Sequence, residues 1–212
     1  EAASRADIGV PGAQRALAEA IFNLGKPVIV LLTSGRPLAA PWLFERADAV
    51  LATWQLGSEA GHALADILFG AVNPTGRLPI SWPRAVGQAP IYYNQRATGR
   101  PTEIGVHYSS CYIDMLATPQ FPFGHGLSYS LFSLLEFSCL TPLVKRGDCV
   151  EVGVRLRNNG SRSGEATLFF FIRDLVASVA RPVLELKGVK KVILAQGQEE
   201  QVSFSLAVEE LA

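Results

Sequence analysis

Hydrophobic and polar positions in the first third of the chain alternate between helical and strand patterns. Leu17, Ile21 and Leu24 recur at helical spacing within residues 12–24, and a continuous apolar run follows at 27–33. A second apolar run at 48–54 precedes another amphipathic segment at 58–69. Strands that alternate with helices predict βαβ units, and uninterrupted apolar runs are typical of parallel strands buried on both faces.

The last third of the chain shows strict alternation instead. Val150, Val152 and Val154 alternate with polar or small residues, and Val202, Phe204 and Leu206 repeat the pattern. Five strands are expected, at 134–140, 149–157, 166–173, 183–194 and 199–207. Turns are expected at Asn158-Asn159-Gly160 and Gln196-Gly197-Gln198. Five short strands favour an immunoglobulin-like sandwich that lacks its last one or two strands.

Between these regions the periodicity stops, and proline, glycine and aromatic residues dominate. True linkers are polar and poor in aromatics, so this segment is expected to be an ordered loop that packs on other protein surface. The predicted organisation is an incomplete α/β sandwich at 1–82, the aromatic-rich loop at 83–132 and a β-sandwich at 133–212. The fold class is therefore α/β followed by all-β.

Composition and charge exclude several classes of protein. Nineteen basic and nineteen acidic residues give a net charge of zero, so neither nucleic acid nor an anionic membrane is an expected partner. Cys111, Cys139 and Cys149 form no zinc-binding pattern, and no metal or cofactor is expected. Free, partly buried thiols and a Cys139–Cys149 bridge both agree with the sequence.

Ordered motifs across the whole chain carry a family resemblance. One is Trp54-x-x-Gly57-Ser58-Glu59-Ala60-Gly61, followed by Ala65-Asp66-Ile67-Leu68-Phe69-Gly70 and Asn73-Pro74-Thr75-Gly76-Arg77-Leu78-Pro79. Another is Phe121-Pro122-Phe123-Gly124-His125-Gly126-Leu127-Ser128-Tyr129. In this order and spacing, the chain resembles the C-terminal part of family 3 glycoside hydrolases, of β-glucosidase or β-xylosidase type. The resemblance implies the end of an α/β-sandwich domain and a truncated fibronectin-type-III-like domain. One departure is Cys111, where larger bacterial members usually carry Arg.

The resemblance also implies an activity, with one catalytic carboxyl group in this chain and the other in a separate domain. The parent enzyme would release terminal β-D-glucosyl or xylosyl residues from oligosaccharides or glucosides with retention, which requires two carboxyl groups. The nucleophilic Asp belongs to an N-terminal barrel that this chain lacks, so the chain alone is expected to be inactive. Glu1 lies where relatives place the acid/base Glu, and it is the candidate acid/base here. The alternative is a non-catalytic module, either a sugar-binding or a structural remnant.

Other candidate residues differ in the chemistry that they offer. Glu59 and Asp66 lie on a predicted helix; a helix N-terminus lowers a carboxyl pKa, so Glu59 suits a structural or supporting role better than that of a general acid. Trp54 either lines a sugar subsite or packs in the core. In the loop 88–101, the side chains of Tyr92, Tyr93 and Arg100 suit sugar recognition or packing on the missing barrel.

The remaining expectations concern partners and location. The partners implied are a β-linked glucoside or oligosaccharide and the missing barrel, and the resemblance favours a periplasmic or secreted protein. The chain starts without Met and without a signal peptide, so its location stays open. Because incomplete sheets leave edges exposed, we expect the isolated chain to form oligomers or aggregates.

Overall fold

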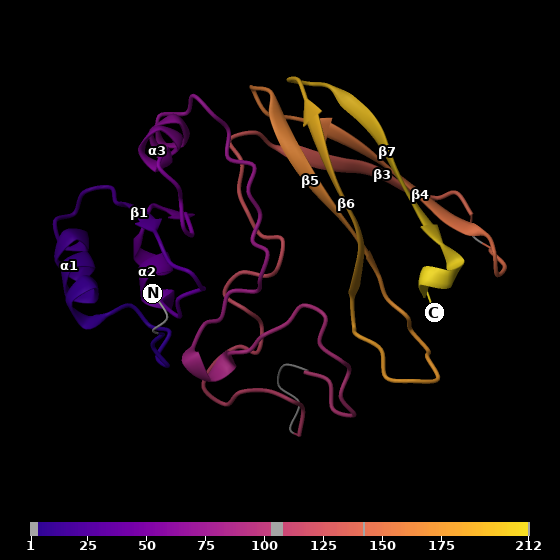
Figure 1. Cartoon of the computed structure of the whole chain (residues 1–212), viewed down its shortest axis with the longest axis horizontal. Helices are drawn as coiled ribbons and strands as arrows, with labels where there is room; N and C mark the ends of the chain where they lie inside the picture. The colour runs from indigo at the N-terminus through magenta and orange to yellow at the C-terminus, as the bar shows by residue number, and fades with distance from the viewer. Residues whose placement is uncertain (1–3, 103–107, 142, 212) are drawn as a thin grey trace. The chain divides into compact units, whose positions relative to one another are not determined.

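The computed structural model describes residues 4–102, 108–141 and 143–211, and Figure 1 shows its elements. The described chain forms two compact units, one from residues 1–63 and 78–125 and the other from 64–77 and 126–212. Its elements are α1 (Gly12–Phe22), β1 (Ile29–Leu32), α2 (Pro41–Arg46), β2 (Ala49–Ala52), α3 (Ala60–Leu68), the 3₁₀ turn η1 (Val86–Gln88), β3 (Phe132–Cys139), β4 (Cys149–Asn158), β5 (Gly164–Ile172), β6 (Glu185–Leu194), β7 (Glu199–Ala207) and η2 (Val208–Leu211).

The first unit contains the predicted parallel sheet. Strands β1 and β2 pair in parallel, with Ile29 opposite Ala49 and Leu32 opposite Ala52, and α2 forms the connection between them. Pro41 opens α2 at a position where a missing backbone N–H costs nothing. The Thr33 and Thr53 hydroxyls lie 2.8 Å apart beyond the carboxyl ends of the two strands. The α/β class expected from the sequence is therefore confirmed.

The core of the first unit is rich in aromatic rings. Its buried residues are Leu32, Ala40, Leu43 and Trp82. Phe44 meets Trp82 and Phe121 edge-on, with ring centroids 5.8 and 4.9 Å apart. Trp82 and Phe121 also form an antiparallel backbone bridge. Part of the aromatic segment is thus built into this core, which joins residues far apart in the sequence.

Burial of the first sheet on both faces, in contrast, is not found. Ile29 and Leu31 are 52% and 41% exposed, whereas Leu32 is buried. No residue of α1 is buried, and Leu17, one of the three residues that predicted the helix, is 62% exposed. The expectation was wrong because an apolar pattern shows which face favours burial, not whether the described chain supplies a covering element.

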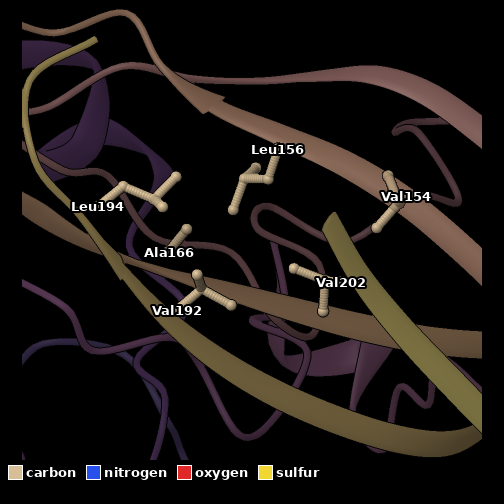
Figure 2. Close-up of a cluster of buried hydrophobic side chains, with 6 residues drawn as sticks. All are labelled: Val154, Leu156, Ala166, Val192, Leu194 and Val202. Atoms are coloured by element: carbon tan, nitrogen blue, oxygen red, sulfur yellow. The ribbon is translucent and has the colours of Figure 1, made fainter. Parts of the chain in front are cut away.

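The second unit is a β-sandwich, as predicted. One sheet has the order β3-β4-β7 and the other pairs β5 with β6, and every pairing within the two sheets is antiparallel. Val154 and Leu156 of β4 and Val202 of β7 meet Ala166, Val192 and Leu194 of the other sheet in one buried cluster (Figure 2). The alternation read from the sequence is the alternation of core and solvent positions.

The end of α3 belongs to the same unit as the sandwich. The Arg162 guanidinium donates to the Gly70 carbonyl (2.6 Å) and lies 5.8 Å from the centre of the Tyr129 ring. The Tyr129 hydroxyl donates to the Ile67 carbonyl (2.8 Å). Carbonyls at the end of a helix lack partners within the helix and favour a cation, so these two side chains complete the end of α3.

The cysteines are free, as one of the two sequence-based alternatives expected, but their exposure differs from that expectation. Cys111, Cys139 and Cys149 are free thiols and all three are exposed rather than partly buried. Cys139 lies opposite Val152, whereas Cys149 lies opposite Ala207. The antiparallel register therefore sends the two cysteines to different partners, and no Cys139–Cys149 bridge forms. Separately, the described residues include no helix long and apolar enough to cross a membrane.

Candidate functional site

Two surface depressions in the first unit share one wall, made by Pro90, Ile91 and Tyr92. The larger depression has a volume of about 380 Å³, and the smaller one about 180 Å³. The rest of the larger lining is Gln88, Gln95, Thr102, Ser110, Cys111, Tyr112 and Ala117. Phenol rings beside amide and hydroxyl groups offer the apolar contact and the directional hydrogen bonds that a sugar requires.

Gln88 lines the larger depression and connects two segments of the chain beside it. The side chain is only 4% exposed. Its Oε1 accepts a hydrogen bond from the Arg84 backbone N–H (2.7 Å), and its Nε2 lies within 3.3 Å of the carbonyl oxygens of Leu116, Ala117 and Thr118. These contacts occupy the amide, so Gln88 ties residues 84–88 to 116–118 and is not available to a ligand.

The two tyrosines predicted from the sequence have different environments. Tyr92 is 61% exposed and stands on the wall that both depressions share. Tyr93 is half-buried and packs on Phe123, with ring centroids 4.5 Å apart. Tyr92 is therefore the member of the pair that is accessible to a ligand.

Arg100 lies on the exposed part of the same loop, outside the linings of both depressions. Its guanidinium carbon is 5.9 Å from the centre of the Tyr108 ring, and its backbone N–H donates to the Thr98 hydroxyl (3.2 Å). Nearby, the Thr102 hydroxyl donates to the Ser110 carbonyl (2.6 Å). These contacts link residues 98–102 with 108–110, which flank the larger depression.

The smaller depression has a mostly apolar lining around one cation. Arg36 is half-buried there beside Ile8, Pro37 and Ile80. The Arg36 Nη2 donates to the Arg5 carbonyl, and the Ala39 backbone N–H donates to the Ile8 carbonyl (2.9 Å). The loop after β1 is thus bonded at two points to the segment that follows Glu1.

The remaining sequence candidates are dispersed. Glu1 lies outside the described residues. Trp54 follows β2 with a positive φ of 51° and packs against Trp82, with ring centroids 5.9 Å apart. Glu59 is strongly exposed, with one carboxylate oxygen 3.9 Å from His62 Nε2, and Asp66 is exposed on α3. None of Trp54, Glu59 and Asp66 lines either depression.

No group of three or more His, Cys, Asp or Glu side chains within the described residues is arranged to hold a metal ion. Burial lowers the pKa of the Arg77 guanidinium from its ordinary value, and the nearby Glu165 carboxylate opposes that change. Arg77 Nη1 donates to the Gly76 carbonyl (2.8 Å), which indicates a structural role.

Sequence reasoning missed Arg36 and Gln88 as residues that organise this surface. Gln88 carried no usable signal, because its partners are backbone carbonyls about thirty positions further along the chain. Arg36 carried one, since it follows a predicted parallel strand. Ligands of α/β proteins gather at the carboxyl ends of such strands.

Comparison with protein families identifies the class of protein. Residues 1–129 match the glycosyl hydrolase family 3 C-terminal domain, and residues 166–212 match the fibronectin type III-like domain. The chain therefore belongs to glycoside hydrolase family 3, and it consists of the C-terminal α/β and β-sandwich parts of such a protein.

Individual curated relatives match this chain over its full length. A periplasmic β-glucosidase of Salmonella typhimurium is 43% identical over all of this chain, and a β-xylosidase of Formosa agariphila is 40% identical. A crystal structure of a β-glucosidase from Listeria innocua superimposes with a TM-score of 0.91 at 42% identity, over 96% of this chain and 28% of that chain. The chain spans 28% of the length of each of these two curated relatives.

Proposed function

We propose that this chain is the C-terminal portion of a retaining exo-β-glycosidase that releases terminal β-D-glucosyl or xylosyl residues from oligosaccharides or glucosides. The observation that carries the proposal is its similarity, over its whole length, to proteins named β-glucosidase and β-xylosidase. The exposed phenol of Tyr92, beside polar groups on a depression of about 380 Å³, agrees with sugar binding at this surface.

In the proposed reaction, two carboxyl groups act in sequence. An Asp carboxylate from the N-terminal barrel attacks the anomeric carbon, and the bond to the leaving oxygen breaks. That oxygen keeps the electron pair and takes the proton of Glu1. Water then attacks the same carbon, Glu1 takes a proton from it, and the Asp carboxylate is released. The overall change is hydrolysis with retention.

The proposal assigns roles to the other candidates as well. Tyr92 and Arg100 are proposed to face the mouth of the active site, and Tyr93 to support the Tyr92 loop by packing on Phe123. Trp54 is proposed as part of a sugar subsite next to the core. Glu59 and Asp66 are proposed to support α3. No cofactor is required, because all the chemistry belongs to the two carboxyl groups.

Partners and location follow from the same proposal. The partner is the barrel that supplies the nucleophile, so the 212-residue chain alone should not turn over substrate. A periplasmic or secreted location is proposed, because the Salmonella relative is named a periplasmic enzyme.

A chimera tests the proposal directly. This chain replaces the aligned region of the Salmonella β-glucosidase, which it matches over 213 residues. We expect the chimera to hydrolyse 4-nitrophenyl β-D-glucoside and the lone chain to release no nitrophenol. An inactive chimera that folds would reject the proposal. Turnover by the lone chain would show that the nucleophile does not come from a barrel. Binding of glucose by the lone chain, with an inactive chimera, would favour a non-catalytic sugar-binding module instead.

A further inference from the structure

The chain contains a single Asn-Gly pair, Asn159–Gly160, in the connection between β4 and β5. Such a pair is prone to spontaneous deamidation, because glycine has no side chain to keep its backbone nitrogen away from the preceding carboxamide. The Gly160 nitrogen forms a bond to Asn159 Cγ, and Nδ2 leaves as ammonia with the proton that Gly160 loses. Water then opens the resulting five-membered ring to aspartate or isoaspartate. Asn159 is exposed, so water has access to it.

In the folded chain, the attacking nitrogen is already engaged. The Gly160 backbone N–H donates a hydrogen bond to Asn158 Oδ1 (2.9 Å). Asn158 is fully buried, and its Nδ2 donates to the Arg162 and Leu194 carbonyls (2.8 and 3.0 Å), so the orientation of its amide is fixed. An amide nitrogen must give up its proton to attack a carbonyl carbon. A hydrogen bond that holds this proton therefore opposes the first step.

The carboxamide that would be attacked is held as well. Asn159 Nδ2 donates to Ser133 Oγ (2.6 Å), and the Asn159 backbone N–H donates to the Leu131 carbonyl (2.7 Å). Gly160 approaches the same segment closely, since a Cβ added to it would lie 2.8 Å from the Leu131 nitrogen. The turn thus has little freedom to adopt the geometry of the five-membered ring while these contacts persist.

We propose that Asn159 is a deamidation site of this protein and that the Asn158 side chain suppresses the reaction while the β-sandwich is folded. The reaction then proceeds from states in which the turn has opened, so its rate depends on the free energy of that local opening. The isoaspartate product adds a methylene group to the backbone between Asn159 and Gly160. Because this longer backbone displaces Gly160 from Asn158 and Leu131, the modified chain should be less stable than the unmodified one.

Incubation of the 212-residue chain in mildly alkaline buffer, with and without denaturing urea, tests the site. Peptide mass mapping detects the conversion of the amide into a carboxyl group, and Asn159→Ala should yield no modified peptide from this turn. We expect Asn159 to react in urea and to react at least about 10-fold more slowly in the folded chain. Equal rates in the two conditions would overturn the protection, and an unreactive Asn159 in urea would overturn the site.

Asn158→Ala and Val202→Ala separate the hydrogen bond from general stability. Val202 is only 5% exposed in the core of the same sandwich, so its truncation destabilises the unit without removing a partner of Gly160. At equal free energies of unfolding, adjusted with urea, Asn158→Ala should deamidate about 3- to 10-fold faster than Val202→Ala. Equal rates would show that unfolding alone controls the reaction and would reject the role of Asn158.

Hydrogen exchange of the Gly160 N–H in the unmodified chain provides a test that holds even if Asn158→Ala does not fold. We expect this amide to exchange much more slowly than in an unstructured peptide, because its proton is bonded to a buried oxygen. Exchange as fast as in the peptide would show that the bond to Asn158 does not persist, and the proposed protection would be rejected.

Discussion

At the scale of single residues, Asn158 is a buried polar side chain of the sandwich with a partner for each of its polar atoms. It is fully buried at the end of β4. Its Nδ2 donates to the carbonyls of Arg162 (2.8 Å) and Leu194 (3.0 Å), and its Oδ1 accepts from the Gly160 backbone N–H (2.9 Å). A buried amide with three partners joins the end of β4, the following turn and the end of β6.

Asn158→Ala should therefore destabilise the second unit by about 2–4 kcal/mol, because it leaves buried backbone groups without partners. Urea unfolding followed by far-ultraviolet circular dichroism measures the change. Asn159→Ala is the matched control, since Asn159 is exposed and its amide only donates to the Ser133 hydroxyl (2.6 Å). We expect a cost below about 1 kcal/mol there. Equal losses in the two variants would contradict the role assigned to burial.

Asn158 also shows where residue-level prediction from the sequence ends. The Asn-Asn-Gly pattern correctly indicated a break after β4, but β4 continues through Asn158, whose side chain donates to the Leu194 carbonyl, 36 positions away. A similar limit applies to Gln88. Residue type and local pattern identify candidate chemistry such as Tyr92, whereas the partners that decide whether a side chain is available come from distant segments.

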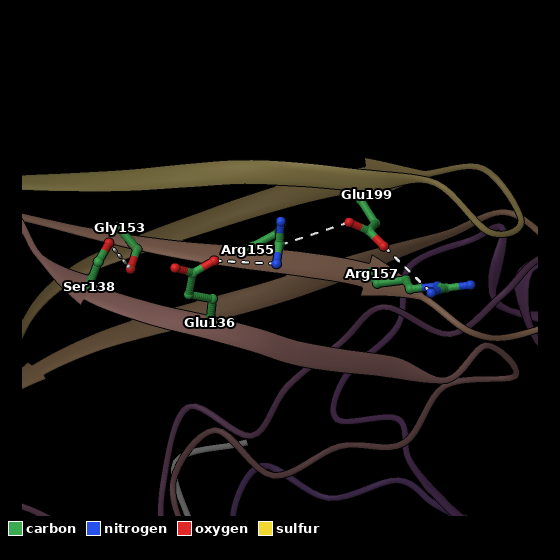
Figure 3. A network of polar contacts seen from close by, with 6 residues as sticks. All are labelled: Glu136, Ser138, Gly153, Arg155, Arg157 and Glu199. Atoms are coloured by element: carbon green, nitrogen blue, oxygen red, sulfur yellow. Dashed lines mark hydrogen bonds and ion pairs between the residues drawn. The ribbon is translucent and has the colours of Figure 1, made fainter.

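At the scale of elements, the solvent face of the β3-β4-β7 sheet carries a line of alternating charges. Arg155 lies between Glu136 (3.3 Å) and Glu199 (3.9 Å), and Arg157 lies 3.5 Å from Glu199 on its other side (Figure 3). The four residues come from three adjacent strands whose register places them side by side. All four side chains are at least 40% exposed, so water screens these pairs.

Arg155→Ala should consequently cost less than about 1 kcal/mol, and the cost should shrink further in 1 M salt, where the screening length is about 3 Å. A double-mutant cycle of Arg155→Ala with Glu136→Ala, followed by urea unfolding at low and high salt, isolates the pair. A coupling energy above about 2 kcal/mol that does not respond to salt would contradict this reading, since it would require a desolvated ion pair.

Elements were predictable where a pattern has a single interpretation. The strand expected at 199–207 is β7, and the one at 149–157 ends one residue later as β4, because period-two alternation defines a half-buried strand closely. The helix expected at 12–24 is also present, as α1. Its environment was not predictable, because burial of Leu17 depends on a covering partner that the described chain does not provide.

At the scale of the whole molecule, the sandwich has sheets of unequal width, and the narrower sheet leaves β3 uncovered. Leu134 lies opposite the buried Leu156, and Phe137 lies opposite the buried Val154, so both point to the inner face. They are nevertheless 64% and 71% exposed. A two-stranded sheet of β5 and β6 cannot cover all three strands of the other sheet.

Association of the isolated chain should therefore depend on the inner face of β3, since exposed apolar side chains beside unpaired strand edges favour self-association. We expect sedimentation velocity to detect oligomers that grow with concentration, and the double variant Leu134→Thr/Phe137→Thr to shift the distribution towards monomer. Leu175→Thr/Val176→Thr is the matched control, because these residues are 81% and 91% exposed and lie on the loop between β5 and β6, outside every strand of the described chain. A monodisperse monomer of the unmodified chain with one cooperative melting transition would contradict the prediction, as would an equal response of both double variants.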